Sequence, residues 1–204
     1  MLKSNVIAVS TLALVVLLPA DSRAQMITPA PVDVTALYVP SGFMGDGEQG
    51  GLVQVRPVTG EKPRPGAEGR PCYKVTYKPG NKAWAGVYWL YPPDNWGDKP
   101  GRSIRGARRI TFWAVGAKGG EIVEFKAGGV TGKRYNDSFE VGIGSVALTA
   151  AWRQYVIELR GTDLSSVIGG FAWVATAASN PGGLTFYLDD IRYEAGNSPA
   201  ANKK

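Results

Sequence analysis

Short apolar segments recur along the chain, and glycine or proline residues separate them. Several of these segments alternate apolar and polar side chains with a period of two, which is typical of a strand with one buried face. Strands are therefore predicted at 51–55, 72–77, 85–90, 109–115, 122–127, 141–148, 154–159, 171–176 and 184–193. Only 164–168 indicates a helical turn. Many short strands divided by turns predict an all-β protein, a two-sheet antiparallel β-sandwich of the jelly-roll type.

The first 24 residues have the pattern of a secretory signal peptide. Lys3 supplies a basic start, residues 6–18 are almost all apolar, and Ser22 and Ala24 form a small-x-small cleavage signal. An N-terminal anchor is the alternative, but an apolar run of about 13 residues is too short to span a bilayer. We expect a secreted or periplasmic protein, cleaved near Ala24 and without a membrane span. The remaining chain divides into a leading segment at 25–42, a sandwich at 43–195 and a flexible tail at 196–204.

Composition narrows the range of functions. The 204 residues carry a net charge of +6 and include no histidine, which excludes Ser-His-Asp and Cys-His catalytic triads and histidine metal sites. The single Cys72 excludes an intramolecular disulfide, and we expect a buried, inert thiol. The arginines at 102, 105, 108 and 109 cluster, but nucleic-acid binding needs more charge and a recognisable module.

Aromatic residues concentrate in the segment 84–98. In a strand, Trp84 and Tyr88 share one face while Trp89 and Tyr91 share the other, so at least one set must pack in the core. The remaining rings are candidate platforms for sugar rings, whose C–H faces are apolar. Core packing is the alternative interpretation for each ring. The candidate ligand-binding residues, including polar neighbours and a ring on the strand at 109–115, are Trp84, Trp89, Tyr91, Asn95, Trp96, Asp98 and Trp113.

Carboxylates suggest a cation site more than a catalytic one. Asp189 and Asp190 are adjacent in the last strand, so one of them is expected to point toward the packed side, where a carboxylate needs a partner. Asp46 and Glu48 lie in a glycine-rich turn and meet the last strand if the first strand is its neighbour. Calcium prefers such oxygen ligands. The alternative is an exposed acidic turn and a hydrogen-bonded strand aspartate.

No convincing catalytic carboxylate pair is found. Glu121 and Glu124 are three residues apart in a strand and therefore face opposite sides, which is unfavourable for a glycosidase pair. Carboxylates from separate strands can also form such a pair, so a small polysaccharide-active enzyme is a further alternative.

Three runs in the second half of the chain carry a family resemblance. They are WRQYVIEL at 152–159, GGFAW at 169–173 and FYLDDI at 186–191. Together they resemble the galactose-binding-like jelly-roll domains, which include many carbohydrate-binding modules of secreted glycosidases. The resemblance spans 43–193 and implies two antiparallel sheets. It also implies a structural calcium held by Asp46 and Asp190, with Glu48 and Asp189 as further candidates, and a sugar site on the concave face or an end loop.

These observations predict a secreted, monomeric, non-catalytic protein that binds a polysaccharide or oligosaccharide by aromatic stacking, with a structural calcium. The main alternative is an extracellular structural or adhesive protein that uses the same surfaces to bind a protein partner.

Overall fold

The computed structural model describes residues 27–195. The expected signal peptide at 1–24 and the expected tail at 196–204 lie outside the described residues. No helix within 27–195 has the length and apolar character that a bilayer-crossing segment requires.

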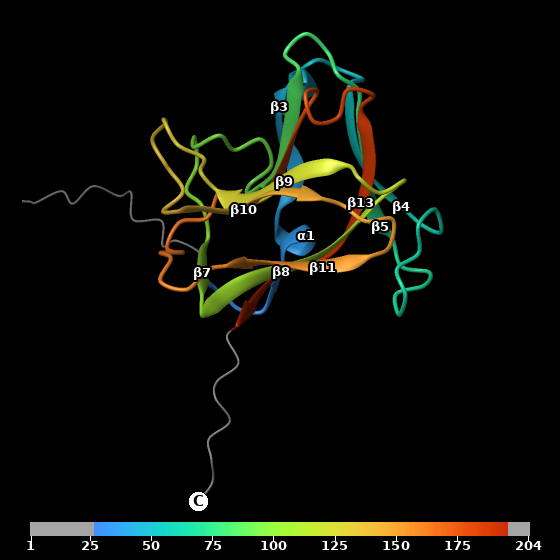
Figure 1. Ribbon diagram of the computed structural model, residues 1–204. Helices are drawn as coiled ribbons and strands as arrows, with labels where there is room; N and C mark the ends of the chain where they lie inside the picture. The colour runs from blue at the N-terminus through green and yellow to red at the C-terminus, as the bar shows by residue number, and fades with distance from the viewer. Residues whose placement is uncertain (1–26, 196–204) are drawn as a thin grey trace, which may run out of the picture.

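The fold is the predicted antiparallel β-sandwich of jelly-roll type, built from two sheets that form separate layers (Figure 1). The first, called here the β6 sheet, has the strand order β10-β9-β12-β6-β3, and its neighbouring strands are all antiparallel. Its strands are β10 Glu140–Ala147, β9 Ile122–Gly128, β12 Gly169–Thr176, β6 Trp84–Leu90 and β3 Val39–Gly45.

The second layer, called here the β13 sheet, has the order β11-β8-β13-β5-β4, and a short β2 also pairs with β13. Its strands are β11 Arg153–Glu158, β8 Ala107–Gly116, β13 Leu184–Ala195, β5 Cys72–Tyr77, β4 Val53–Val58 and β2 Val32–Asp33. The remaining elements are a parallel pair, β1 Ile27–Pro29 with β7 Ser103–Arg105, the helical turn α1 Val34–Leu37 and the 3-10 turn η1 Asp46–Glu48.

Every strand predicted from the apolar pattern is confirmed, but the predicted helical turn at 164–168 is wrong. None of these residues is helical, and Val167 instead forms a two-way backbone bridge with Arg102, with N···O distances of 2.9 and 2.7 Å. The helical turn lies instead at α1, where the Asp33 side chain accepts a hydrogen bond from the Thr35 amide at 2.9 Å. An N-cap aspartate of this kind satisfies an otherwise unpaired amide.

The sandwich also begins before the expected boundary at Phe43. Strand β3 starts at Val39 and pairs with β6, while β1 and β2 pair with β7 and β13. These early strands contain Pro29, Pro40 and Gly42, which hide the alternation that marks the later strands.

Aromatic side chains from both sheets form the centre of the core. Phe112 of β8 contacts two rings of the opposite sheet, with centroid distances of 4.7 Å to Phe125 and 5.0 Å to Phe171. Trp173 meets Phe186 of β13 edge-on at 5.5 Å. All five side chains are fully buried. The centre of the core is therefore built from aromatic rings of both sheets in contact with one another.

A single glycine links β3 to the turn that follows it. Gly45 has φ 63° and ψ −129°, a combination that only glycine adopts readily. A Cβ atom on Gly45 would lie 2.9 Å from the Trp84 ring and closer still to the Trp84 carbonyl oxygen. The backbone at Gly45 therefore sets where both Trp84 and the following Asp46 lie.

We expect Gly45→Ala to lower the free energy of unfolding by about 3 kcal/mol, because it adds both backbone strain and a steric clash. Chemical denaturation measures the change. Gly50→Ala is the matched control, since no atom lies within 4 Å of its Cβ position and its φ is not in the left-handed region. A Gly45→Ala protein as stable as the control would contradict the described junction.

Candidate functional site

Strand β6 divides its aromatic residues between the core and the surface. Trp89 points inward and is fully buried, with ring centroids 5.6 Å from Phe171 and 5.7 Å from Tyr73. The prediction of Trp89 as a ligand platform is therefore wrong, because its register opposite Phe171 places the indole between the sheets.

The alternate residues of β6 lie on the outer face. Trp84, at the start of the strand, is 37% exposed and is the one aromatic residue among the exposed large apolar side chains of 27–195. Tyr88 is buried under its neighbours and donates a hydrogen bond from its hydroxyl to the Gly128 carbonyl at 2.9 Å. The half-buried Trp96 packs edge-on against Tyr88 at 5.9 Å. Since four residues of a strand span about 13 Å, Trp84 and the Tyr88–Trp96 pair are well separated along this face.

The strand register shows what lies between these rings. Two rows cross the outer face of the β6 sheet, and each mixes very small residues with polar or apolar ones. The first row is Gly142, Lys126, Ala172, Tyr88 and Gly42, and the second is Ser145, Glu124, Val174, Gly86 and Met44. The glycine and alanine residues have little or no side chain and so leave space above the sheet, while the charged and hydroxyl groups can form hydrogen bonds with a ligand.

Several residues of this surface, such as Lys126 and Ser145, are not among the candidates that the sequence indicates. Lys126 forms an ion pair with Glu140 at 2.6 Å and lies 5.7 Å from the centre of the Tyr88 ring. Only the pairing of β9 with β10 and β12 places these side chains on the same face as Tyr88, and a single strand carries no signal of that pairing.

The loop after β6 uses its polar residues internally. The buried Asn95 amide donates to the carbonyls of Tyr91 and Lys99, both at 2.9 Å, and its oxygen accepts from the amides of Gly97 and Lys99. These bonds use all its donors and acceptors. Asn95 therefore braces the loop that carries Trp96 and has nothing left for a ligand, contrary to the prediction. Asp98 is exposed and pairs with Lys133 at 2.7 Å.

Two further candidate rings lie away from Trp84. Tyr91 is half-buried, with its ring 5.9 Å from Tyr38 and 4.4 Å from the Arg102 guanidinium. Trp113 belongs to β8 and faces outward from the β13 sheet, where the Arg64 guanidinium lies 5.0 Å from the ring centre. Trp113 is therefore not part of the same platform as Trp84, because β8 and β6 belong to different sheets.

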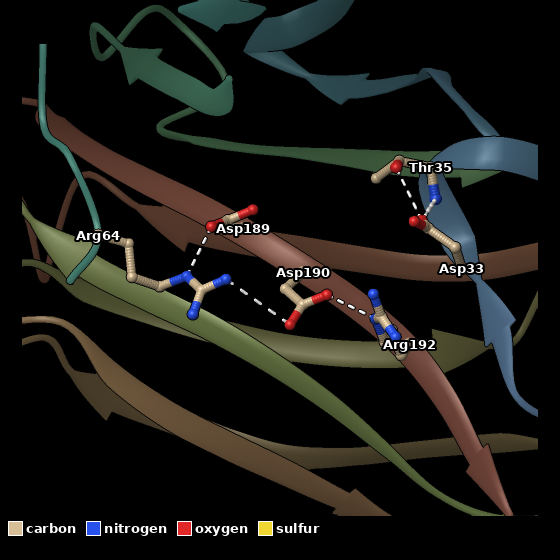
Figure 2. A network of polar contacts seen from close by, with 6 residues as sticks. All are labelled: Asp33, Thr35, Arg64, Asp189, Asp190 and Arg192. Carbon is tan, nitrogen blue, oxygen red and sulfur yellow. Dashed lines mark hydrogen bonds and ion pairs between the residues drawn. The ribbon is translucent and has the colours of Figure 1, made fainter. Parts of the chain in front are cut away.

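The paired aspartates of β13 bind arginines. Arg64 Nε lies 2.6 Å from Asp189 and its Nη2 lies 3.7 Å from Asp190, which also pairs with Arg192 at 2.5 Å (Figure 2). Neither aspartate enters the core, although alternation predicted that one would. The reason is a bulge: Asp190 has φ 53°, and the register with β8 shifts between Asp189 and Arg192. Both carboxylates can therefore reach the same guanidinium.

Asp46 is fully buried at the other end of the molecule. Its carboxylate accepts hydrogen bonds from the amides of Gly80 and Lys82 at 2.8 Å and from the Tyr77 hydroxyl at 2.9 Å. Burial acts to raise the pKa of Asp46, but these bonds outweigh it and lower the pKa below its usual value of 3.8. Burial and the Asp46 carboxylate raise the pKa of Tyr77 to about 12, so its hydroxyl keeps its proton.

The expected calcium ligands are not brought together. Asp46 bonds to Tyr77, which pairs with Leu184 at the start of β13, whereas Asp190 lies six residues further along that strand, about 20 Å away. Glu48 pairs with Lys82 at 2.9 Å. Within 27–195, no group of three or more His, Cys, Asp or Glu side chains has a metal-binding arrangement. The residues present, already bonded to N–H, O–H and guanidinium donors, do not fit the calcium that the family resemblance implies.

We therefore expect chelation to leave the melting temperature unchanged, while Asp46→Asn lowers it at neutral pH. The lowered pKa of Asp46 means that its carboxylate stabilises the fold above its usual pKa, and that this contribution is lost as the pH falls through the folded-state pKa. The difference between wild type and Asp46→Asn should accordingly shrink in acid. Thermal denaturation from pH 7 to pH 2, with and without EDTA, measures both effects, and a fall in melting temperature with EDTA would contradict this assignment.

Comparison with known proteins gives a likeness of fold. No protein-family model matches this sequence, and no curated protein matches it. Among solved structures, the family 11 carbohydrate-binding module of the cellulosomal cellulase Lic26A-Cel5E of Clostridium thermocellum is similar, with a TM-score of 0.53 and 13% identity. That match covers 81% of this chain and 94% of the module.

Two other solved structures have a similar fold. A family 30 carbohydrate-binding module matches with a TM-score of 0.50 and 20% identity over 81% of this chain and 99% of that one. An exo-beta-agarase matches with a TM-score of 0.53 and 10% identity over 83% of this chain, but over only 26% of the enzyme. The chain thus has the β-sandwich fold of the carbohydrate-binding modules, as the sequence resemblance implied.

Proposed function

We propose that this chain is an exported, non-catalytic carbohydrate-binding protein whose ligand lies along the outer face of the β6 sheet. The observation that carries the proposal is the exposed indole of Trp84 at one end of that face. On a fold shared with carbohydrate-binding modules, an uncovered ring beside small residues is a surface on which a sugar ring can stack.

The surroundings of Trp84 support this mode of binding. Gly45 lies beneath the ring, so the indole is braced against backbone and keeps its orientation. Glu124 and Ser145 lie in the adjacent row, where their oxygens can bond to sugar hydroxyls. A rigid aromatic anchor loses little conformational entropy on binding, which is why such rings contribute strongly at binding surfaces.

A non-catalytic role is supported by the roles of the carboxylates. Glu121 accepts hydrogen bonds from the amides of Lys118 and Gly119 at 2.9 and 3.0 Å and so orders a turn. Glu124 is its nearest carboxylate in sequence, and alternation along β9 places Glu124 on the outer face. The chain has no histidine to act as an acid or base at neutral pH.

For a polysaccharide that binds the wild-type protein, we expect Trp84→Ala to weaken binding about tenfold, because the stacking surface is removed. Affinity electrophoresis against a panel of soluble neutral polysaccharides measures the loss. Val156→Ala is the matched control, since Val156 is 40% exposed but belongs to β11 of the other sheet. Both variants should stay folded at the temperature of the assay.

Two outcomes would reject the proposal. One is a wild-type protein that no polysaccharide of a broad panel retards. The other is equal retardation of wild type and Trp84→Ala by a polysaccharide that does bind, which would place the ligand elsewhere.

Export is tested separately. We expect the protein recovered from outside the cytoplasm to begin near Gln25, because the sequence at 22–24 has the pattern of a cleavage site. N-terminal sequencing of the native protein measures this. An intact Met1 would contradict export by a cleaved signal peptide.

A further inference from the structure

A groove of about 580 Å³ lies at one end of the β13 sheet, on a different face from Trp84. Its floor is a row of three polar side chains, Gln54 of β4, Thr76 of β5 and Thr185 of β13, which the strand register places next to one another. Their neighbours Val75 and Leu184 belong to the core, so alternation turns the polar row outward.

The chemistry of this groove differs from that of the β6 sheet. Its one aromatic residue, Tyr77, is buried, so no ring is available for stacking. Asn180 and Glu121 also line it, but both are engaged: Asn180 bonds to the backbone of Ile122 and Thr176, and Glu121 bonds to two backbone amides. The side chains left for a ligand are therefore hydroxyl, amide and ammonium groups.

Two lysines flank the polar row. Lys78 follows β5 and Lys118 follows β8, and β13 with Thr185 lies between those strands. Two strand spacings separate the flanking strands by about 10 Å. Both side chains are exposed, and neither forms an ion pair with any residue of 27–195, whereas nearby Lys74 and Lys82 pair with glutamates.

We propose that this groove binds an acidic oligosaccharide, with a carboxylate or sulfate group held between Lys78 and Lys118 and hydroxyls bonded to Gln54, Thr76 and Thr185. The two ammonium groups outweigh the single Glu121 carboxylate, which is partly neutralised by its amide donors, so the groove favours an anion. The proposal concerns a second site and does not depend on sugar stacking at Trp84.

The test uses two probes, tetragalacturonate and a sulfated galactose tetrasaccharide, with neutral galactotetraose as the reference. Amide chemical shifts of the whole protein at low ionic strength locate binding, and titration calorimetry measures affinity. We expect shifts at Thr76 and Thr185 with at least one acidic probe, about tenfold weaker binding in a Lys78→Gln/Lys118→Gln variant, and weakening by salt. The probe that binds identifies the anion.

Lys74→Gln/Lys82→Gln is the matched control, because it removes the same two positive charges at positions outside the groove. Its affinity for the acidic probe should stay within about twofold of wild type. Equal weakening in this control and in Lys78→Gln/Lys118→Gln would show a response to net charge alone and would overturn the site, as would shifts absent from Thr76 and Thr185 with both probes.

Trp84→Ala separates this inference from the proposed function. The variant should keep its affinity for the acidic probe even if it loses neutral polysaccharides. If Trp84→Ala abolishes binding of the acidic probe, the anion binds on the β6 sheet and the groove is not its site.

Discussion

The contact between aromatic rings of the two sheets is the interaction on which the rest of this structure depends. Phe112 of β8 lies against Phe125 and Phe171 of the opposite sheet, and Trp173 meets Phe186. Large rings bury more apolar area than any other side chains, so these contacts fix which face of each strand is inside. Because strand residues alternate, fixing the inner face also fixes the residues that remain outside.

The two outer faces that result are chemically different. On the outer face of the β6 sheet, Gly86 lies between Trp84 and Tyr88, and Ala172 and Gly42 lie beside Tyr88, so small residues separate the rings from the few charged side chains. On the β13 sheet, Arg64 of the long 59–71 segment covers Trp113, while the end near Thr185 stays open as a polar groove. One fold therefore presents a ring-bearing surface and a lysine-flanked groove.

The sequence predicts most of the strands because their apolar alternation is local and strong, as in 72–77 and 184–193. It does not predict β3, where Pro40 and Gly42 interrupt the pattern, although the strand pairs with β6 on both sides of a bulge at Ser41. In β6, both faces carry rings, and only the distant pairing of Trp89 with Phe171 decides that Trp84 is the surface residue. The alternation within a segment therefore predicts the strands, whereas the pairing between distant strands decides which side chains form the candidate site.

The aspartates of the last strand show the same limit most clearly. Their adjacent positions indicate a need for positive charge, but the sequence does not show that the charge comes from Arg64, 125 residues away. A guanidinium suits this role because it is planar, permanently charged and able to bond two carboxylates at once. Unlike a bound ion, it is also attached to the chain, so satisfying Asp189 and Asp190 at the same time holds the 59–71 segment against Trp113. This arrangement covers Trp113 with a guanidinium, while the Thr185 end of the same sheet stays open as a polar groove.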